Sequence, residues 1–81
     1  MISKKDITNY LNKLNIDIND FNIELKELLK GARHEYNEHF NNNNESVNLN
    51  IPNKKINALK IALAHLIEFP NYYIVLKELN L

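Results

Sequence analysis

The segment 61–73, which reads I-A-L-A-H-L-I-E-F-P-N-Y-Y, constrains the fold of this chain more than any other stretch. Its apolar residues occupy most sides of a helix, and such a helix is stable only when it is central or covered by other elements. Pro70 ends this helix, because the residue before a proline is pushed out of the α region. The segment therefore predicts a central helix, a break at Pro70 and a short helix after it.

The hydrophobic pattern of the whole chain predicts an all-α fold. Apolar residues recur at the three-to-four residue spacing of a helix face. Because the chain has only 81 residues, we expect one helical domain, residues 1–81, around one modest core. Four helices are predicted at about residues 4–15, 21–40, 54–69 and 72–79, and an Asn-rich loop at 41–53.

The predicted helix starts and the single glycine add detail. Ser3 and Asp6 have the spacing of a capping box, in which each side chain satisfies a free backbone N–H of the first turn. Asp20 is the expected N-cap of the second helix, with Asp17 and Asn19 as alternatives. Gly31 lies in the middle of that helix, where it costs ~1 kcal/mol relative to Ala. We interpret it as a point where another backbone approaches closely.

Composition excludes several classes of function. Ten acidic and ten basic residues give a formal net charge of zero, which disfavours binding to nucleic acid or to an anionic membrane and favours self-association. The chain contains no cysteine, so neither a disulfide framework nor a thiolate metal site is predicted. No apolar run is long enough for a signal core or a membrane span, which predicts an intracellular, cytoplasmic protein.

Four ionisable residues lie on or beside apolar helix faces, where such residues are unusual. They are Glu35 and His39 on the second helix, and His65 and Glu68 on the third. One interpretation is a site for a divalent metal such as Zn, Fe or Mn, which imidazole and carboxylate ligands suit. The other is a buried hydrogen-bonded cluster completed by a hydroxyl of Tyr72 or Tyr73. The spacing alone does not show whether the two pairs converge.

No catalytic motif is present. His34, Glu35 and His39 resemble the zinc-protease pattern H-E-x-x-H, but one extra residue separates the histidines and turns them to different sides of the helix. We expect His34 to be a solvated surface residue. A chain with one glycine has no phosphate-binding glycine loop, and we identify no nucleophile with its base.

The residues 61–76, I-A-L-A-H-L-I-E-F-P-N-Y-Y-I-V-L, resemble the signature I-A-x-x-H-L-x-E-x-P-x-Y-Y-x-x-L of a domain-of-unknown-function family of bacterial and viral proteins. The upstream part of the family signature, G-x-x-x-E-x-E-H, is met by Gly31 and Glu35, whereas Glu38 and His39 come one residue late. The resemblance implies a small helical domain and a shared site at Glu35, His65 and Glu68. It implies no activity, and for a viral protein the compartment would be the host cytoplasm.

Two functional hypotheses follow. The first is an interaction module that binds a protein partner or a second copy of itself, because 81 residues can hardly cover the apolar surface of the last two helices. The alternative is a metal-binding helical domain with an unassigned activity, in which Glu35, His39, His65 and Glu68 are the ligands. We do not expect an enzyme under the first hypothesis.

Overall fold

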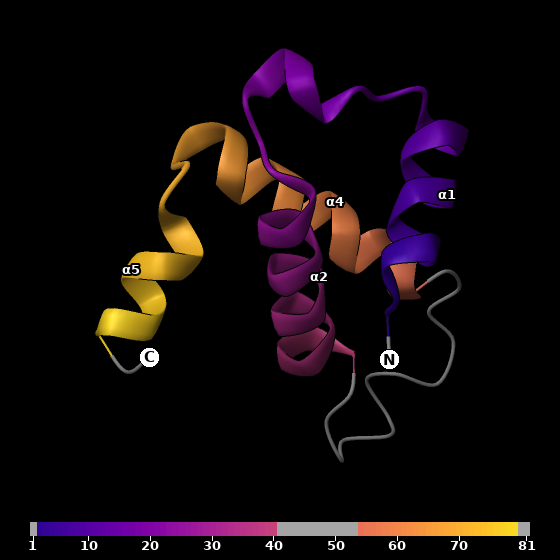
Figure 1. Ribbon diagram of the computed structural model, residues 1–81. Helices are drawn as coiled ribbons and strands as arrows, with labels where there is room; N and C mark the ends of the chain where they lie inside the picture. The colour runs from indigo at the N-terminus through magenta and orange to yellow at the C-terminus, as the bar shows by residue number, and fades with distance from the viewer. Residues whose placement is uncertain (1, 41–53, 80–81) are drawn as a thin grey trace.

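The computed structural model describes residues 2–40 and 54–79 of the chain (Figure 1). Within these residues it contains four α-helices, and the all-α prediction is confirmed. The helices are α1 (Lys4–Leu14), α2 (Leu25–His39), α4 (Lys54–Glu68) and α5 (Tyr72–Glu78), and a short 3-10 helix, η1 (Ile18–Phe21), precedes α2. The predicted loop at 41–53 lies outside the described residues.

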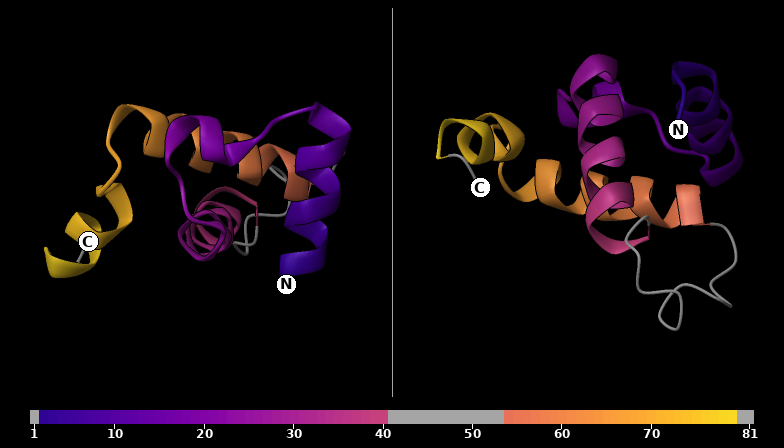
Figure 2. Two further views of the ribbon diagram at one scale, coloured as in Figure 1. Left: turned by 45° about the horizontal axis from the view of Figure 1, so that its top comes forward. Right: turned by 90° about the horizontal axis from the view of Figure 1, so that it is seen from below.

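The helices are arranged around the crossing of α2 and α4. Helix α4 passes across α2 at a steep angle instead of running alongside it (Figures 1 and 2). Helices α1 and α5 lie on opposite sides of α2, and the chain bends sharply between α4 and α5, at Pro70 (Figure 1). With this bend, His65 near the end of α4 and Tyr73 near the start of α5 both reach Glu35 in α2.

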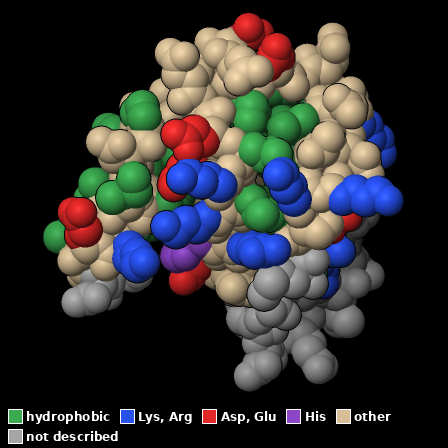
Figure 3. Space-filling model, in the orientation of Figure 1, with side chains coloured by type: hydrophobic (Ala, Val, Ile, Leu, Met, Phe, Trp, Pro, Cys, Tyr) green, Lys and Arg blue, Asp and Glu red, His purple; other side chains and the backbone are tan. Residues whose placement is uncertain are grey.

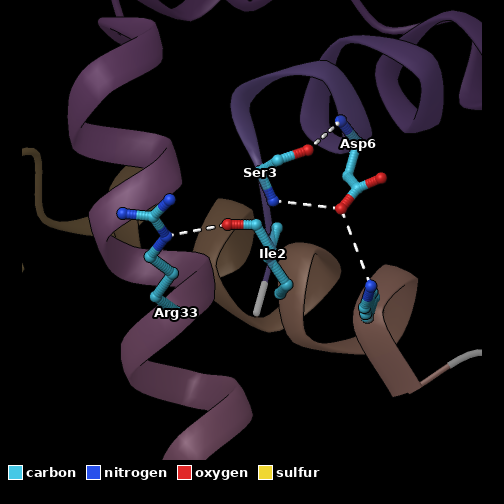
Figure 4. Close-up of polar contacts among 5 residues, drawn as sticks. Ile2, Ser3, Asp6 and Arg33 are labelled. Carbon is cyan, nitrogen blue, oxygen red and sulfur yellow. Dashed lines mark hydrogen bonds and ion pairs between the residues drawn. The ribbon is translucent and has the colours of Figure 1, made fainter.

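The N-terminal segment is fixed by the predicted capping box (Figure 4). The backbone N–H of Asp6 donates to Ser3 Oγ at 3.1 Å, and the backbone N–H of Ser3 donates to Asp6 Oδ2 at 3.0 Å. Asp6 also forms an ion pair with Lys55 of α4, at 3.7 Å from Nζ to Oδ2. On the other side, Arg33 Nε of α2 donates to the backbone carbonyl of Ile2 at 2.8 Å. These contacts tie α1 to both central helices.

The start of α2 differs from the prediction. The helix begins at Leu25 with Glu24 as its N-cap, and Asp17 caps η1 instead by accepting from the backbone N–H of Asn19 at 2.9 Å. Asn22 ends η1 in the left-handed conformation, with φ of 58°, which asparagine tolerates better than most residues. Phe21 therefore leaves the predicted core stripe, and 46% of its surface is exposed.

The core lies where α1, α2 and α4 meet. Ile2 is buried just before α1 and Ile7 within it, Leu28 and Ala32 are buried on α2, and α4 contributes the largest share. The buried residues of α4 are Ala58, Leu59, Ala62, Leu63 and Leu66. This confirms α4 as the central helix expected from its apolar surface. None of the helices in the described ranges is long and apolar enough to cross a membrane.

Candidate functional site

The site is built where α5 folds back on α2, and Gly31 makes that contact close. The ring of Tyr73 lies against Gly31, and a Cβ at this position would lie 2.9 Å from Tyr73 Cδ2 and Cζ. Such distances are shorter than packed side chains tolerate, so only glycine fits without movement of the ring. The sequence prediction of a close approach holds, but the group that approaches is an aromatic side chain and not a backbone.

The Tyr73 ring, placed in this way, directs its hydroxyl to Glu35 one turn further along α2. Tyr73 Oη donates to Glu35 Oε2 at 2.7 Å. Glu35 is only 4% exposed and Tyr73 is equally buried. Burial and the adjacent Glu35 raise the pKa of Tyr73 well above its ordinary value, so the hydroxyl keeps its proton and stays a donor. A buried carboxyl group requires such a partner.

Two histidines approach the same carboxyl group from different helices. His39 lies one turn after Glu35 on α2, with 3.2 Å from Nε2 to Glu35 Oε1. His65 comes from α4, with 3.8 Å from Nε2 to Glu35 Oε2. The His39 side chain is 53% exposed and that of His65 is 34% exposed, so solvent reaches both imidazoles while Glu35 is shielded. The carboxyl group is thus held between a buried hydroxyl and two accessible rings.

Tyr72 packs against the ring of His65. The two rings are stacked, with centroids 4.3 Å apart and planes 7° from parallel. Tyr73 lies edge-on to Tyr72 at 5.0 Å, so the tyrosine pair at the start of α5 has two separate roles. Tyr72 stacks on the histidine, and Tyr73 bonds the carboxyl group. Both roles depend on α5 beginning directly after the break at Pro70.

The structure thus brings together five residues named from the sequence: Glu35, His39, His65, Tyr72 and Tyr73. Glu68 is not among them, because it is exposed at the end of α4 and makes no ion pair with the described residues. In residues 2–40 and 54–79, no three or more His, Cys, Asp and Glu side chains are grouped so that they could hold a metal ion. The site therefore consists of a hydrogen-bonded carboxyl group, that of Glu35, flanked by the imidazoles of His39 and His65.

His34 differs from the sequence prediction. It is partly buried instead of fully solvated, and its ring lies edge-on to Tyr73 with centroids 5.6 Å apart. The prediction was wrong because a helix wheel shows only the neighbours on the same helix, and α5 covers this side of α2. Gly31 was the one feature of the sequence that could have indicated this contact. His34 follows Gly31 by one helical turn, and both lie beside the Tyr73 ring.

The fold and the site define a small all-α domain with a buried acid at the crossing of its central helices. Residues 7–81 match the family described as "Protein of unknown function (DUF5661)". The chain belongs to this family, which agrees with the resemblance to an uncharacterised family seen in the sequence. Searches of curated proteins and of solved structures gave no match.

Proposed function

We propose that this protein is a helical interaction module that pairs with a second copy of itself through the outer face of α5. The observation that carries the proposal is an apolar groove, called here the α5 groove. It has a volume of about 380 Å³. Its lining residues are Phe69, Pro70, Asn71, Tyr72, Val75 and Leu76.

Several apolar residues in or beside the α5 groove are exposed. Phe69 and Leu79 are each 61% exposed, and Val75 is 46% exposed. Figure 3 shows hydrophobic side chains at the surface over α5. Exposed apolar side chains that gather on one helix support an interaction site there. Positions 72, 75, 76 and 79 also follow the spacing with which one helix packs against another.

The partner that the features of this chain favour is a second copy of itself. A helix with an apolar ridge beside an apolar groove can pair with its own copy about a twofold axis, each ridge filling the other groove. The formal net charge of zero removes the repulsion between copies. Since α5 has only seven residues, the buried area falls below the ~800 Å² per partner of a stable complex, and we expect a weak dimer.

Sedimentation analysis across about 10 to 500 µM tests this proposal, because a weak dimer shows itself only as concentration rises. We expect the average mass to rise toward that of a dimer, and Val75→Glu to abolish the rise by placing a charge in the contact. Phe21→Glu is the matched control, since Phe21 is equally exposed but lies on η1. A monomer throughout, or the same loss in both variants, would overturn the proposal.

A second candidate function, divalent-metal binding, is supported by the approach of His39 and His65 to Glu35. Imidazole and carboxylate groups are common ligands of Zn, Fe and Mn. His39 and His65 face different oxygens of Glu35, so both rings must turn toward one ion. Glu68, at the end of the same helix as His65, remains a predicted fourth ligand.

The metal hypothesis is tested by titrating tag-free protein with Zn²⁺ while binding is followed by calorimetry. We expect one ion per chain and a large loss of affinity in His39→Ala and in His65→Ala. The chain has three histidines, so His34→Ala is a matched control that should bind like the native protein. Equal losses in all three variants, or none, would contradict a site at Glu35.

A further inference from the structure

A second pocket is lined by residues of α2 and α5. Its volume is about 250 Å³. It is lined by Lys30, His34, Tyr73, Leu76 and Lys77. Figure 3 shows Lys and Arg side chains gathered with a histidine along α2 and the facing side of α5. Neither the α5 groove nor the Glu35 cluster contains the two lysines.

Two lysines line this pocket, and no Asp or Glu does. Lys30 from α2 and Lys77 from α5 are both exposed, and neither forms an ion pair with the described residues. Acidic residues occur nearby on the same helices, at Glu27, Glu38 and Glu78, yet none of them lines the pocket. Two lysines reaching one pocket from different helices, with no carboxylate between them, favour an anionic occupant.

The inner wall of the pocket is apolar. Tyr73 is buried, and its hydroxyl already donates to Glu35, so the ring offers the pocket carbon atoms only. Leu76 adds a second apolar side chain, and His34 lies edge-on to the ring. A pocket lined by two lysines and by apolar side chains fits a ligand that carries both an anionic and an apolar group.

We propose that this pocket binds a small oxyanion, a phosphate or a carboxylate, joined to a planar apolar group. The oxyanion lies between the ammonium groups of Lys30 and Lys77, and His34 supplies a third N–H donor. The planar group lies against Tyr73 and Leu76. Both lysines remain in contact with water, so the affinity is modest and falls as salt screens the charges.

Amide NMR titration of the full chain tests the proposal with four probes: phenyl phosphate, benzoate, inorganic phosphate and benzyl alcohol. We expect phenyl phosphate, benzoate or both to shift the amides of residues 30, 34, 73 and 77 in a saturable way. Binding of phenyl phosphate alone identifies a phosphate site, and binding of both identifies a general oxyanion site. Inorganic phosphate should bind more weakly, and benzyl alcohol should cause no saturable shift.

Lys30→Ala and Lys77→Ala should each weaken binding by about three-fold or more, the effect of removing one partly hydrated ion pair. Lys60→Ala is the matched control, because Lys60 is an exposed lysine of α4 that does not line the pocket. Equal weakening in all three variants would overturn the proposal. So would an equal response to benzyl alcohol, or the absence of saturable shifts.

Discussion

Tyr73 Oη donates a 2.7 Å hydrogen bond to Glu35 Oε2, and this bond joins the last helix to the middle of the second. The two residues are 38 positions apart in the sequence, and both are buried. The bond satisfies a carboxyl group that is almost completely buried. Beside this bond, Gly31 lies against the Tyr73 ring, and Tyr72 stacks on His65.

Removal of the Tyr73 hydroxyl should destabilise the protein although the ring is kept. Tyr73→Phe leaves a buried carboxyl oxygen without its donor, which costs about 1–3 kcal/mol of unfolding free energy. Urea unfolding followed by circular dichroism measures this loss. Tyr10→Phe, which removes a hydroxyl away from Glu35, should change the unfolding free energy by less than about 0.5 kcal/mol. Equal effects of the two substitutions would argue against the bond.

Burial of the Tyr73 hydroxyl beside Glu35 should make the protein sensitive to alkaline pH. Burial first, and Glu35 second, raise the pKa of Tyr73 above its ordinary value of 10.0. A group whose pKa is higher in the folded state contributes its full stability below the unfolded pKa, and that stability is lost as pH rises above it. The unfolding free energy should therefore fall above about pH 10, where tyrosine ionises in the unfolded chain. Tyr73→Phe should flatten this decline.

Gly31→Ala should have opposite effects in two backgrounds. In the native chain the new Cβ overlaps the Tyr73 ring, and overpacking of this kind costs about 1–3 kcal/mol. In a Tyr73→Ala background the ring is gone, and the higher helix propensity of alanine should stabilise α2 by up to about 1 kcal/mol. Thermal or urea unfolding of the four proteins measures both changes. Destabilisation of similar size in both backgrounds would show that the ring is not the cause.

Asp6 should make the N-terminal contact sensitive to acid. The backbone N–H of Ser3 is the main cause that holds the pKa of Asp6 below its usual value of 3.8, and Lys55 contributes in the same direction. A lowered folded-state pKa gives stability that is present above the unfolded pKa and lost as pH falls below it. Carbon-detected NMR should therefore place the Asp6 pKa below 3.8. Lys55→Ala should raise that pKa only in part, because the Ser3 bonds remain.

Two apolar residues near the start of α2 should differ sharply in importance. Leu28 is fully buried, so Leu28→Ala should cost about 2–5 kcal/mol of unfolding free energy. Phe21 is half-exposed on η1, and Phe21→Ala should cost less than about 1 kcal/mol although the side chain is larger. Denaturant unfolding of both variants measures this difference. A larger loss of unfolding free energy for Phe21→Ala than for Leu28→Ala would indicate that Phe21 belongs to the core, as the periodicity predicts.

Periodicity and helix-stop signals were sufficient to predict most of the fold. The apolar surface of α4, the stop at Pro70 and the Ser3 capping box all depend on neighbours in sequence, and all are present. The early start of the second helix was wrong because Asn22 takes a left-handed conformation that the hydrophobic pattern does not reveal. Because the chain contains many asparagines, the sequence does not show which of them takes the left-handed conformation.

The candidate site was predictable only in part, for a related reason. A helix wheel placed Glu35 on the core side of α2, but it could not show which groups of α4 and α5 reach it. The crossing of α2 and α4 brings His65 to Glu35, and the exposed end of α4 leaves Glu68 away from it. The partner of Gly31 also comes from α5, so no local pattern could identify the Tyr73 ring.

The close fit of Tyr73 against Gly31 has a consequence for how the two faces of α5 communicate. The inner face keeps water from Glu35, and the outer face forms the α5 groove. A contact that stabilises the packing of α5 on α2 also stabilises the buried state of Glu35. Conversely, binding or hydration that exposes the Glu35 carboxyl group weakens the packing of α5 on α2. Such reciprocity is a thermodynamic necessity when two events share one element. A partner bound at the outer face of α5 and the burial of Glu35 are therefore coupled through the contact between Tyr73 and Gly31.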